Sequence, residues 1–299
     1  MQSQKKYIPN ELLIAIGILI FELAYFTFLS NWLNQWFVFR AHLPTLVIFS
    51  GMFAGLAVSY YEYRGIGPQE GIVRRGTNGL EIALTFDDGP NPEYTNEILD
   101  VLKKKQVKAA FFMVGKHVEK YPEVAKRVFN EGHDIGNHTY SHRDLVSATR
   151  KTIIKEIDQT DKAMMRVLGI KTKLFRPPRG MFSNSVRKLI IEMGYTIILW
   201  TDSAKDWRGS TPKTIVRRVT RHIKSGGVIL FHDSGSLIRS EGADRGNTVA
   251  ALPLVIDEIR RKGYKIVALS QMLNELDHIE EERFIEVLLP PSAAAGQEI

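Results

Sequence analysis

The chain has 299 residues and a formal net charge of +7, from 40 lysines and arginines against 33 aspartates and glutamates. This length leaves room for one enzyme domain of roughly 200–250 residues with additional segments. Cysteine is absent, which excludes disulfide bonds and thiolate metal sites, so any metal must be held by histidine and carboxylate side chains. The positive charge suits anionic surfaces such as cell wall or phospholipid headgroups, but it is also typical of an ordinary solvated surface.

Two long apolar runs dominate the N-terminal region. Residues 12–29 are interrupted only by Glu22, and residues 43–61 carry no charge. Each run approaches the roughly 20 residues that cross the hydrocarbon core, and aromatic residues flank both runs as at a membrane interface. No clear cleavage site follows the first run, which argues against a signal peptide. We expect residues 1–65 to form a membrane hairpin of two transmembrane helices. One span with an interfacial segment and a buried core hairpin are the alternatives.

From residue 80 onward, strand-like apolar runs alternate with amphipathic helical patterns, as in parallel strands joined by crossover helices. The predicted strands are residues 81–86, 108–114, 133–136, 173–176, 195–199, 227–231 and 264–268. The predicted helices are residues 93–105, 122–131, 150–168, 183–193, 212–224 and 248–262. We therefore expect a linker over residues 66–79, an α/β domain over residues 80–275 and a frayed tail over residues 276–299.

Two adjacent carboxylates, Asp87 and Asp88, follow the apolar run 80–86 and precede the turn residues Gly89 and Pro90. They therefore lie at the carboxyl end of the first predicted strand. Successive side chains of an extended segment point in opposite directions, so one carboxylate can bind a metal while the other remains free as a base. An Asp-rich turn that caps the next helix is the alternative for this stretch taken alone.

Other unusual polar residues also follow predicted strands. They are His138 and His142 after the third strand, Arg176 at the end of the fourth, Asp206 and Trp207 after the fifth, and His232 and Asp233 after the sixth. In a barrel of parallel strands, the loops at the carboxyl ends converge and form the active site. The coincidence of five strand ends favours a functional site over separate local explanations.

The segment His138-Thr139-Tyr140-Ser141-His142 places two imidazoles four residues apart. Both can face one point if this segment is a helical turn or a tight loop. Together with Asp88 they offer two histidines and one carboxylate, with open positions for water and substrate. Such a set suits hydrolytic zinc, and it also suits cobalt or non-haem iron.

Five ordered motifs in this chain resemble those of the polysaccharide deacetylases, carbohydrate esterase family 4. They read TFDDGP, HTYSH, RPPRG, the Asp206-Trp207 pair and LFHD, between residues 85 and 233. The similarity covers about residues 80 to 270 and leaves out the N-terminal apolar runs and the tail. It implies a distorted (β/α)7 barrel and the hydrolysis of an acetamide on an amino sugar.

The resemblance also implies a role for each motif residue. It assigns Asp88, His138 and His142 to a divalent metal, most simply Zn²⁺ or else Co²⁺, and Asp87 as general base. It assigns His232 as general acid, Arg176 as the partner of Asp87, and Asp206 as the residue that orients His232. The backbone N–H of Arg179 would hold the oxyanion, and Pro178, Trp207 and Leu230 would line the substrate pocket.

Three positions depart from the family pattern. Arg179 stands where many members carry tyrosine, which leaves the backbone donor intact but changes the side-chain contacts; the RPPRG form resembles a subgroup acting on muramic-acid-containing peptidoglycan. Ser203 stands where the first aspartate of the usual DxxDW motif falls, with Asp202 shifted by one. Asp233 is an additional acid without an assigned role, and a turn cap is its simplest explanation.

The leading hypothesis is a membrane-anchored, metal-dependent enzyme that removes N-acetyl groups from amino sugars of peptidoglycan or a related polysaccharide. One alternative keeps the chemistry and replaces the substrate with a lipid-linked amino sugar. Others are a catalytically silent glycan-binding module and an iron oxygenase. We expect a glycan and the membrane as partners, no nucleic acid, and a monomeric protein.

The charge distribution and the expected substrate predict different sides of the membrane for the catalytic domain. The basic residues near the apolar runs are Lys5, Lys6, Arg40, Arg64, Arg74 and Arg75. By the positive-inside rule they place both ends of a hairpin in the cytoplasm. A cell-wall polymer lies outside, and on that ground we expect an extracytoplasmic catalytic domain.

Overall fold

The computed structural model describes residues 69–77, 79–235 and 243–273, together with parts of two helices within residues 17–28 and 47–55. The chain divides into two compact units, Met1–Pro68 and Gln69–Ile299. Among the residues described, no helix is both long enough and apolar enough to cross a bilayer. Much of the predicted spans 12–29 and 43–61, and all of the tail 276–299, lie outside the described residues.

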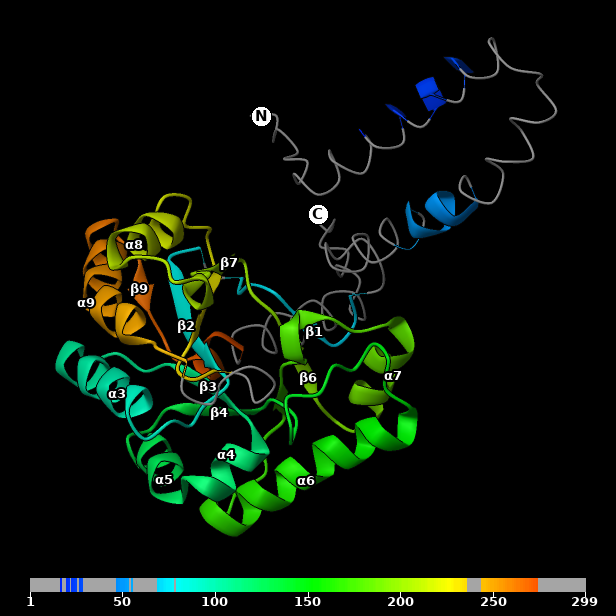
Figure 1. Cartoon of the computed structure of the whole chain (residues 1–299). Coiled ribbons are helices and arrows are strands. Elements are labelled where there is room, and N and C mark those ends of the chain that lie inside the picture. The colour runs from blue at the N-terminus through cyan, green and yellow to red at the C-terminus, as the bar shows by residue number, and fades with distance from the viewer. Residues whose placement is uncertain are drawn as a thin grey trace, which may run out of the picture. The chain divides into compact units, whose positions relative to one another are not determined.

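The second unit is built on one sheet of nine strands, and every strand pair in it is parallel (Figure 1). The strands are β1 (Ile72–Val73), β2 (Glu81–Asp87), β3 (Ala110–Met113), β4 (Asp134–Asn137), β5 (Leu174–Phe175), β6 (Thr196–Ile198), β7 (Asp202–Ser203), β8 (Gly227–His232) and β9 (Lys265–Ile266). Their order is β1-β6-β5-β4-β3-β2-β8-β7, with β9 paired to β2. The sheet curves so far that Arg75, just after β1, forms a bridge with Gly227 of β8.

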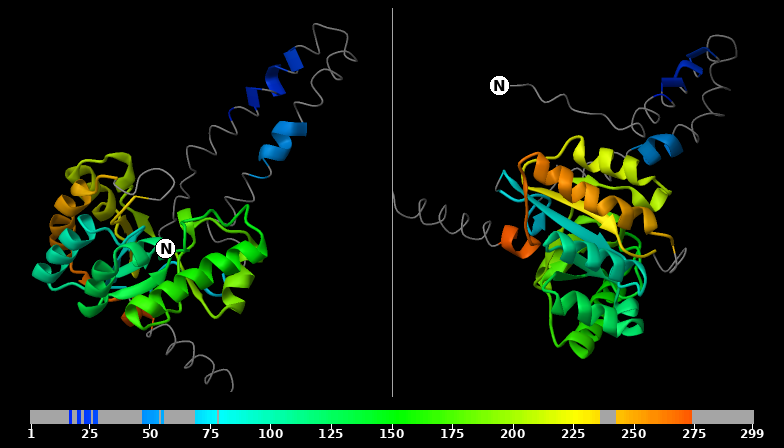
Figure 2. Two further views of the ribbon diagram at one scale, coloured as in Figure 1. Left: turned by 60° about the horizontal axis from the view of Figure 1, so that its bottom comes forward. Right: turned by 90° about the vertical axis from the view of Figure 1, so that its left-hand side faces the viewer.

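Helices connect the strands and lie on the outer side of the sheet (Figure 2). They are α3 (Tyr94–Lys105), α4 (Gly115–Lys120), α5 (Pro122–Asn130), α6 (Arg150–Leu168), α7 (Asn184–Glu192), α8 (Pro212–Thr220) and α9 (Gly246–Arg261), with 3-10 turns at Pro178–Gly180 and Asp206–Arg208. Side chains of Thr149, Ser183 and Thr211 accept hydrogen bonds from the first turns of α6, α7 and α8. These caps satisfy backbone donors that a helix start leaves free.

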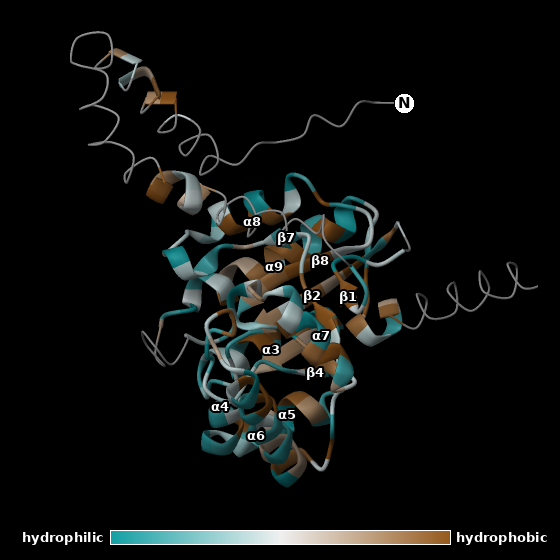
Figure 3. Cartoon of the chain, turned by 90° about the vertical axis from the view of Figure 1, so that its right-hand side faces the viewer, coloured by the Kyte–Doolittle hydropathy of each residue, from teal (hydrophilic) through white to brown (hydrophobic). Residues whose placement is uncertain are grey.

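Successive side chains of β2 point to opposite faces of the sheet, so they contribute to two hydrophobic clusters, one under the helices and one inside the curved sheet. Ile82, Leu84 and Phe86 pack outward under the helices, in the larger cluster. Ala83 belongs to the inner cluster with Ala110, Phe112, Val228 and Leu269. Figure 3 shows the apolar strands enclosed between helices whose outer faces are hydrophilic. Because side chains alternate along a strand, Thr85 and Asp87 share the inward direction of Ala83.

The α/β class of parallel strands predicted from the sequence is confirmed, and each of the seven predicted strands has a counterpart in the sheet. Three short elements were missed, namely β1, β7 and α4. Strand β1 lies in the segment expected to be a linker, and it pairs with β6. Strands β1 and β7 have two residues each, which is too short for a periodicity to be visible.

Candidate active site

The carboxyl end of β2 sends its two aspartates in different directions. Asp87 is the last residue of the strand, and in the sheet it lies beside His232 of β8. Asp88 follows with a φ of 81°, a left-handed conformation that non-glycine residues seldom adopt and that often marks a functional site. Its carbonyl oxygen lies 2.6 Å from Nδ1 of His117. Both aspartate side chains are buried.

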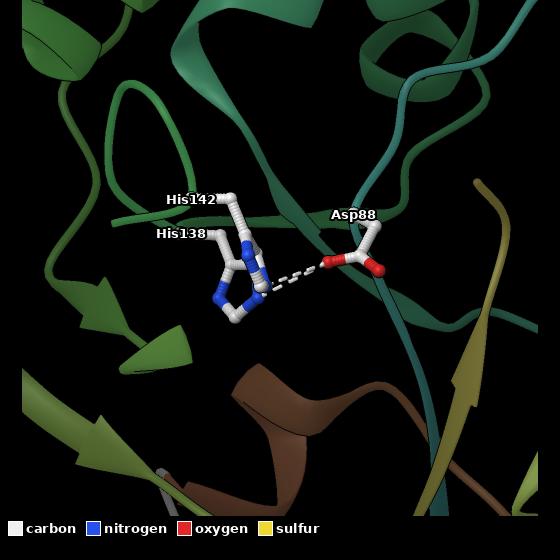
Figure 4. A group of neighbouring side chains, drawn as sticks. All are labelled: Asp88, His138 and His142. Atoms are coloured by element: carbon white, nitrogen blue, oxygen red, sulfur yellow. Dashed lines mark ion pairs between the residues drawn. The ribbon is translucent and has the colours of Figure 1, made fainter. Parts of the chain in front are cut away.

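Asp88, His138 and His142 converge on one point (Figure 4). Oδ1 of Asp88 lies 3.1 Å from Nε2 of His142 and 3.5 Å from Nε2 of His138. All three residues are buried, and one candidate ligand atom from each lies within 4.8 Å of the others. Burial opposes ionisation of Asp88, but its close contacts with His138 and His142 and the nearby His232 hold its pKa well below the usual value.

The tautomer of His138 prepares this cluster for a cation. Nδ1 of His138 lies 2.7 Å from the carbonyl oxygen of Arg176, and an acceptor there requires the Nδ1 proton. In neutral His138, Nε2 then directs a lone pair toward the Asp88 carboxylate. Oδ1 of Asp88 is buried and has no hydrogen-bond partner among the described residues. The donor set therefore fits a divalent cation, which needs deprotonated ligands of this kind.

A tight loop, and not a helical turn, brings the two histidines together. Thr139 and His142 have φ values of 65° and 53°. The carboxylate of Glu156 accepts hydrogen bonds from both the backbone N–H and the hydroxyl of Ser141, each at 2.8 Å. Oδ1 of Asn137 accepts from the N–H of Thr139 at 2.9 Å. These bonds hold the loop in its shape.

Glu156 and Asn137 were not among the residues singled out from the sequence. Glu156 lies on the buried face of α6, between Ile153 and Ile157, and an acid on an apolar stripe indicates a buried polar partner. That signal was available. Asn137 is the last residue of β4 and is fully buried, and no local pattern distinguishes it from a turn residue.

Arg176 is fully buried beneath Asp87. Its Nη1 lies 2.7 Å from Oδ1 of Asp87, and its guanidinium lies 4.0 Å above the ring of Phe112. It also donates hydrogen bonds to Thr85 Oγ1, Ile198 O and Leu199 O. Burial lowers the pKa of Arg176, and the charge of Asp87 opposes this shift. The pair leaves Oδ2 of Asp87 facing the metal-ligand cluster, 3.8 Å from Nε2 of His138.

His232 is held by Asp206, which comes from the turn after β7. Nδ1 of His232 lies 2.8 Å from Oδ1 of Asp206, whose Oδ2 accepts the backbone N–H of His232. The hydroxyl of Thr248 also donates to Oδ2, at 3.0 Å. Burial favours neutral His232, but Asp206, Asp88 and Asp87 outweigh it and raise its pKa to about 9. The imidazole is therefore protonated at neutral pH and can donate from Nε2.

Asp206→Asn is expected to shift the pH dependence of the reaction. Burial lowers the pKa of His232 and the Asp206 charge raises it. Without that charge, the pKa of His232 falls from about 9. The alkaline limb of kcat/KM, where the acid loses its proton, then moves to lower pH by about 1–3 units. A pH–rate profile measures this. Thr248→Val removes a hydrogen bond to Asp206 without removing its charge and should move the limb less. An unchanged limb in Asp206→Asn contradicts the assignment.

The residues expected to bind substrate lie around this group. Arg179 has a φ of 60° and sits in the 3-10 turn Pro178–Gly180, and its side chain reaches Asp144 at 3.3 Å. Pro178 and Leu230 are buried. Trp207 is 45% exposed, and its ring meets that of His232 edge to face at 5.1 Å. The exposed ring of Trp207 thus lies next to the protonated imidazole, and Leu230 lies two residues before His232 on β8.

Asp233, which had no assigned role, clamps the turn after Asp88. Its Oδ1 accepts the backbone N–H of Gly89 at 2.9 Å, and its Oδ2 accepts the hydroxyl of Thr95 at 2.6 Å. A Cβ at position 89 would lie 2.1 Å from Oδ2 of Asp233, so only glycine fits there. Burial raises the pKa of Asp233 to about 7. The clamp joins β8, the Asp88 turn and the start of α3.

Asp233→Ala is expected to weaken Zn²⁺ binding about 10- to 100-fold, as is usual when a group that positions a metal ligand is lost. Metal-buffer competition measures this without relying on activity. Thr95→Val keeps the bond from Gly89 to Asp233 and removes the bond to Asp233 Oδ2, together with the bond that the Thr95 hydroxyl accepts from the N–H of Asn91, so it should cost less metal affinity. Wild-type metal affinity in Asp233→Ala would show that the turn holds its shape without the clamp.

Comparisons with known proteins agree with this geometry. A family model described as polysaccharide deacetylase matches residues 74–198. Among curated proteins, a peptidoglycan-N-acetylglucosamine deacetylase of Bacillus cereus is 37% identical over 215 residues, which is 72% of this chain and 73% of the relative.

Two solved structures share the fold. The crystal structure of a peptidoglycan N-acetylglucosamine deacetylase bound to an N-hydroxybenzamide compound has a TM-score of 0.64 and 37% identity, and the match covers 68% of this chain and 92% of the other. A pseudoenzyme of the same esterase family from Bacillus anthracis has a TM-score of 0.61 and 28% identity, over 68% of each chain. Since a pseudoenzyme shares the fold, the case for activity depends on the site residues.

Proposed function

Because the chain belongs to the polysaccharide deacetylase family, we propose that it is a metal-dependent hydrolase that removes N-acetyl groups from amino sugars of peptidoglycan or a related glycan. The observation that carries this proposal is the convergence of the Asp88, His138 and His142 cluster with a separate carboxylate and a protonated imidazole. Acetamide hydrolysis needs these three functions together: a Lewis acid, a base and an acid.

Asp87 is the proposed general base. Its Oδ1 is occupied by Arg176, and its Oδ2 faces the cluster, so Oδ2 can take a proton from a water that attacks the acetamide carbon. A divalent cation held by Asp88, His138 and His142, most simply Zn²⁺, would supply the Lewis acidity that polarises the acetamide and makes this water more acidic. The hydrogen bond from Arg176 to Oδ1 fixes the orientation of the Asp87 carboxylate.

His232 is the proposed general acid. As the carbon–nitrogen bond breaks, Nε2 gives its proton to the departing amine, so the products are acetate and a free amino sugar. Asp206 keeps the proton on Nε2 available by fixing Nδ1. The backbone N–H of Arg179 is the proposed donor to the developing oxyanion. Leu230 and Trp207 would form the acetyl pocket, whose size discriminates methyl from larger acyl groups.

The alternatives differ in substrate or in chemistry. A catalytically silent glycan-binding module should lack a ligand or an acid, whereas here Asp88, His138, His142 and His232 are all present. A lipid-linked amino sugar remains the second candidate substrate, and it is favoured by the apolar N-terminal region. We further propose attachment to the membrane through that region, with the catalytic domain on the outer side where wall polymers lie.

The proposal is tested by measuring acetate release from N-acetylglucosamine oligomers, from peptidoglycan and from a lipid-linked amino sugar, with and without Zn²⁺. We expect metal-dependent release of acetate. His138→Ala should abolish this release, because the two remaining ligands, Asp88 and His142, are too few to hold the cation. His133→Ala is the control, since His133 is buried, is not one of the clustered ligands, and accepts the N–H of Ala109 through Nδ1. Mass spectrometry of the sugar identifies which residue loses its acetyl group. Zinc-loaded protein without release from any substrate would overturn the proposal.

A further inference from the structure

A row of basic side chains on α8 takes no part in the proposed chemistry. Lys213, Arg217 and the C-cap residue Arg221 are spaced by four residues, so they share one face of the helix, and Lys224 lies just beyond the helix end. All four residues, hereafter the basic row, are exposed. The stretch 207–232 contains no aspartate or glutamate. The row is therefore a concentrated cationic surface.

The basic row has no partner among the described residues, where no carboxylate lies within ion-pair distance of any of its four side chains. Asp202, which is half-buried, interacts electrostatically with Lys224 but forms no ion pair with it. Some helical cations elsewhere are paired, as Lys105 is with Asp257 and Arg261 with Glu258. Like charges four residues apart destabilise a helix. An anionic surface would therefore reduce the repulsion between the side chains of the basic row.

Arg218, the neighbour of Arg217, does not belong to the basic row, because its side chain is used within the fold. Arg218 points the other way and donates to the carbonyl of Ala204 and the hydroxyl of Ser210, which anchors the loop before α8. At the other end of the row, Arg75 donates to the carbonyl of Ser225 at 2.6 Å, directly beside Lys224. The cationic surface thus extends to Arg75, close to the start of the second unit.

Few residues separate this cationic surface from the N-terminal unit along the chain. That unit ends at Pro68, seven residues before Arg75, and an extended chain of that length spans at most about 25 Å. The described residues of the N-terminal unit expose many large apolar side chains: Ile20, Phe21, Leu23, Tyr25, Phe28, Val47, Ile48 and Met52. Apolar surface of this extent is typical of contact with lipid.

We propose that the basic row of α8 docks on the anionic headgroups of the membrane to which the N-terminal region attaches. Lysine and arginine close to such a surface each contribute about a fivefold gain in binding, and the attraction fades within a Debye length. The tether keeps the row within reach of the surface, which favours lipid phosphates over the phosphates of a wall polymer. Docking would fix which side of the catalytic domain faces the bilayer, and it does not depend on deacetylation.

The test uses the full chain in nanodiscs of neutral lipid or with about 30% anionic phosphatidylglycerol, whose charge attracts basic segments. Since the chain has no cysteine, His222→Cys places a single fluorophore beside the row, and Lys126→Cys places one on α5, on the opposite side of the unit (Figures 1 and 3). Lipids with a nitroxide headgroup quench a fluorophore that touches the surface. We expect quenching at position 222, in anionic nanodiscs only, and little at position 126.

Two double variants with equal changes in net charge decide the assignment. Arg217→Glu with Arg221→Glu should lower the docking constant at least about 25-fold, from two fivefold contributions. Lys103→Glu with Lys104→Glu, exposed at the end of α3, should leave quenching unchanged. Circular dichroism and acetate release from a soluble oligomer check that both variants fold. Equal quenching in neutral nanodiscs, equal loss in both variants, or binding to soluble poly(glycerol phosphate) without quenching by anionic nanodiscs would overturn the proposal.

Discussion

Asp87→Asn is expected to lower kcat/KM for deacetylation by about 10²–10⁴-fold, the usual contribution of a positioned general base. Asparagine has nearly the same shape, and its amide oxygen can still accept the hydrogen bond that Arg176 now gives to Oδ1. It cannot take a proton from water. Steady-state kinetics measure the loss, and elemental analysis should show unchanged metal content because Asp88, His138 and His142 remain.

The control for this substitution is Asp158→Asn, on the exposed side of α6, which should retain wild-type activity. A loss of less than about tenfold in Asp87→Asn would contradict its role as base, since even a modest base contributes more. Loss of metal together with activity would instead indicate that Asp87 is a ligand. The geometry argues against this, because Oδ2 of Asp87 lies farther from His138 than the Asp88 carboxylate does.

Arg176→Met is expected to destabilise the second unit by about 3–5 kcal/mol, the usual cost of removing one partner of a buried ion pair. Arg176 is fully buried, and its removal leaves Asp87 as an unpaired charge in the interior. At roughly 2–4 °C per kcal/mol for a unit of this size, the midpoint of thermal unfolding should fall by about 6–20 °C. Calorimetry or circular dichroism on heating measures this.

The double variant Arg176→Met with Asp87→Asn separates charge from packing. With both charges removed, no buried ion is left unpaired, so the double variant should be more stable than Arg176→Met alone. Arg187→Met is the matched control. Arg187 is also buried but bonds the amide of Asn184 and the carbonyl of Glu70, so it leaves no buried carboxylate behind. A double variant no more stable than the single one would show that the destabilisation comes from lost packing.

Much of the fold could be predicted because its signals are local. Strand β2 shows why: its seven residues are buried throughout, and a continuous apolar run between turn residues indicates such a strand. The helix caps at Thr149, Ser183 and Thr211 follow the same local rules. Strands β1 and β7 were missed because two residues paired to a distant strand leave no local pattern.

The sequence by itself determined the kinds of residue at the site and their positions at the carboxyl ends of strands. It could not determine which atoms meet. The family resemblance grouped Asp88 with the histidines and Asp87 with Arg176, but only the tertiary structure shows the left-handed backbone of Asp88 and the atoms through which these residues meet. Asp206 reaches His232 and Asp233 reaches Gly89 for the same reason. These contacts depend on the register of parallel strands, which is set by packing over the whole sheet and not by neighbours in the chain.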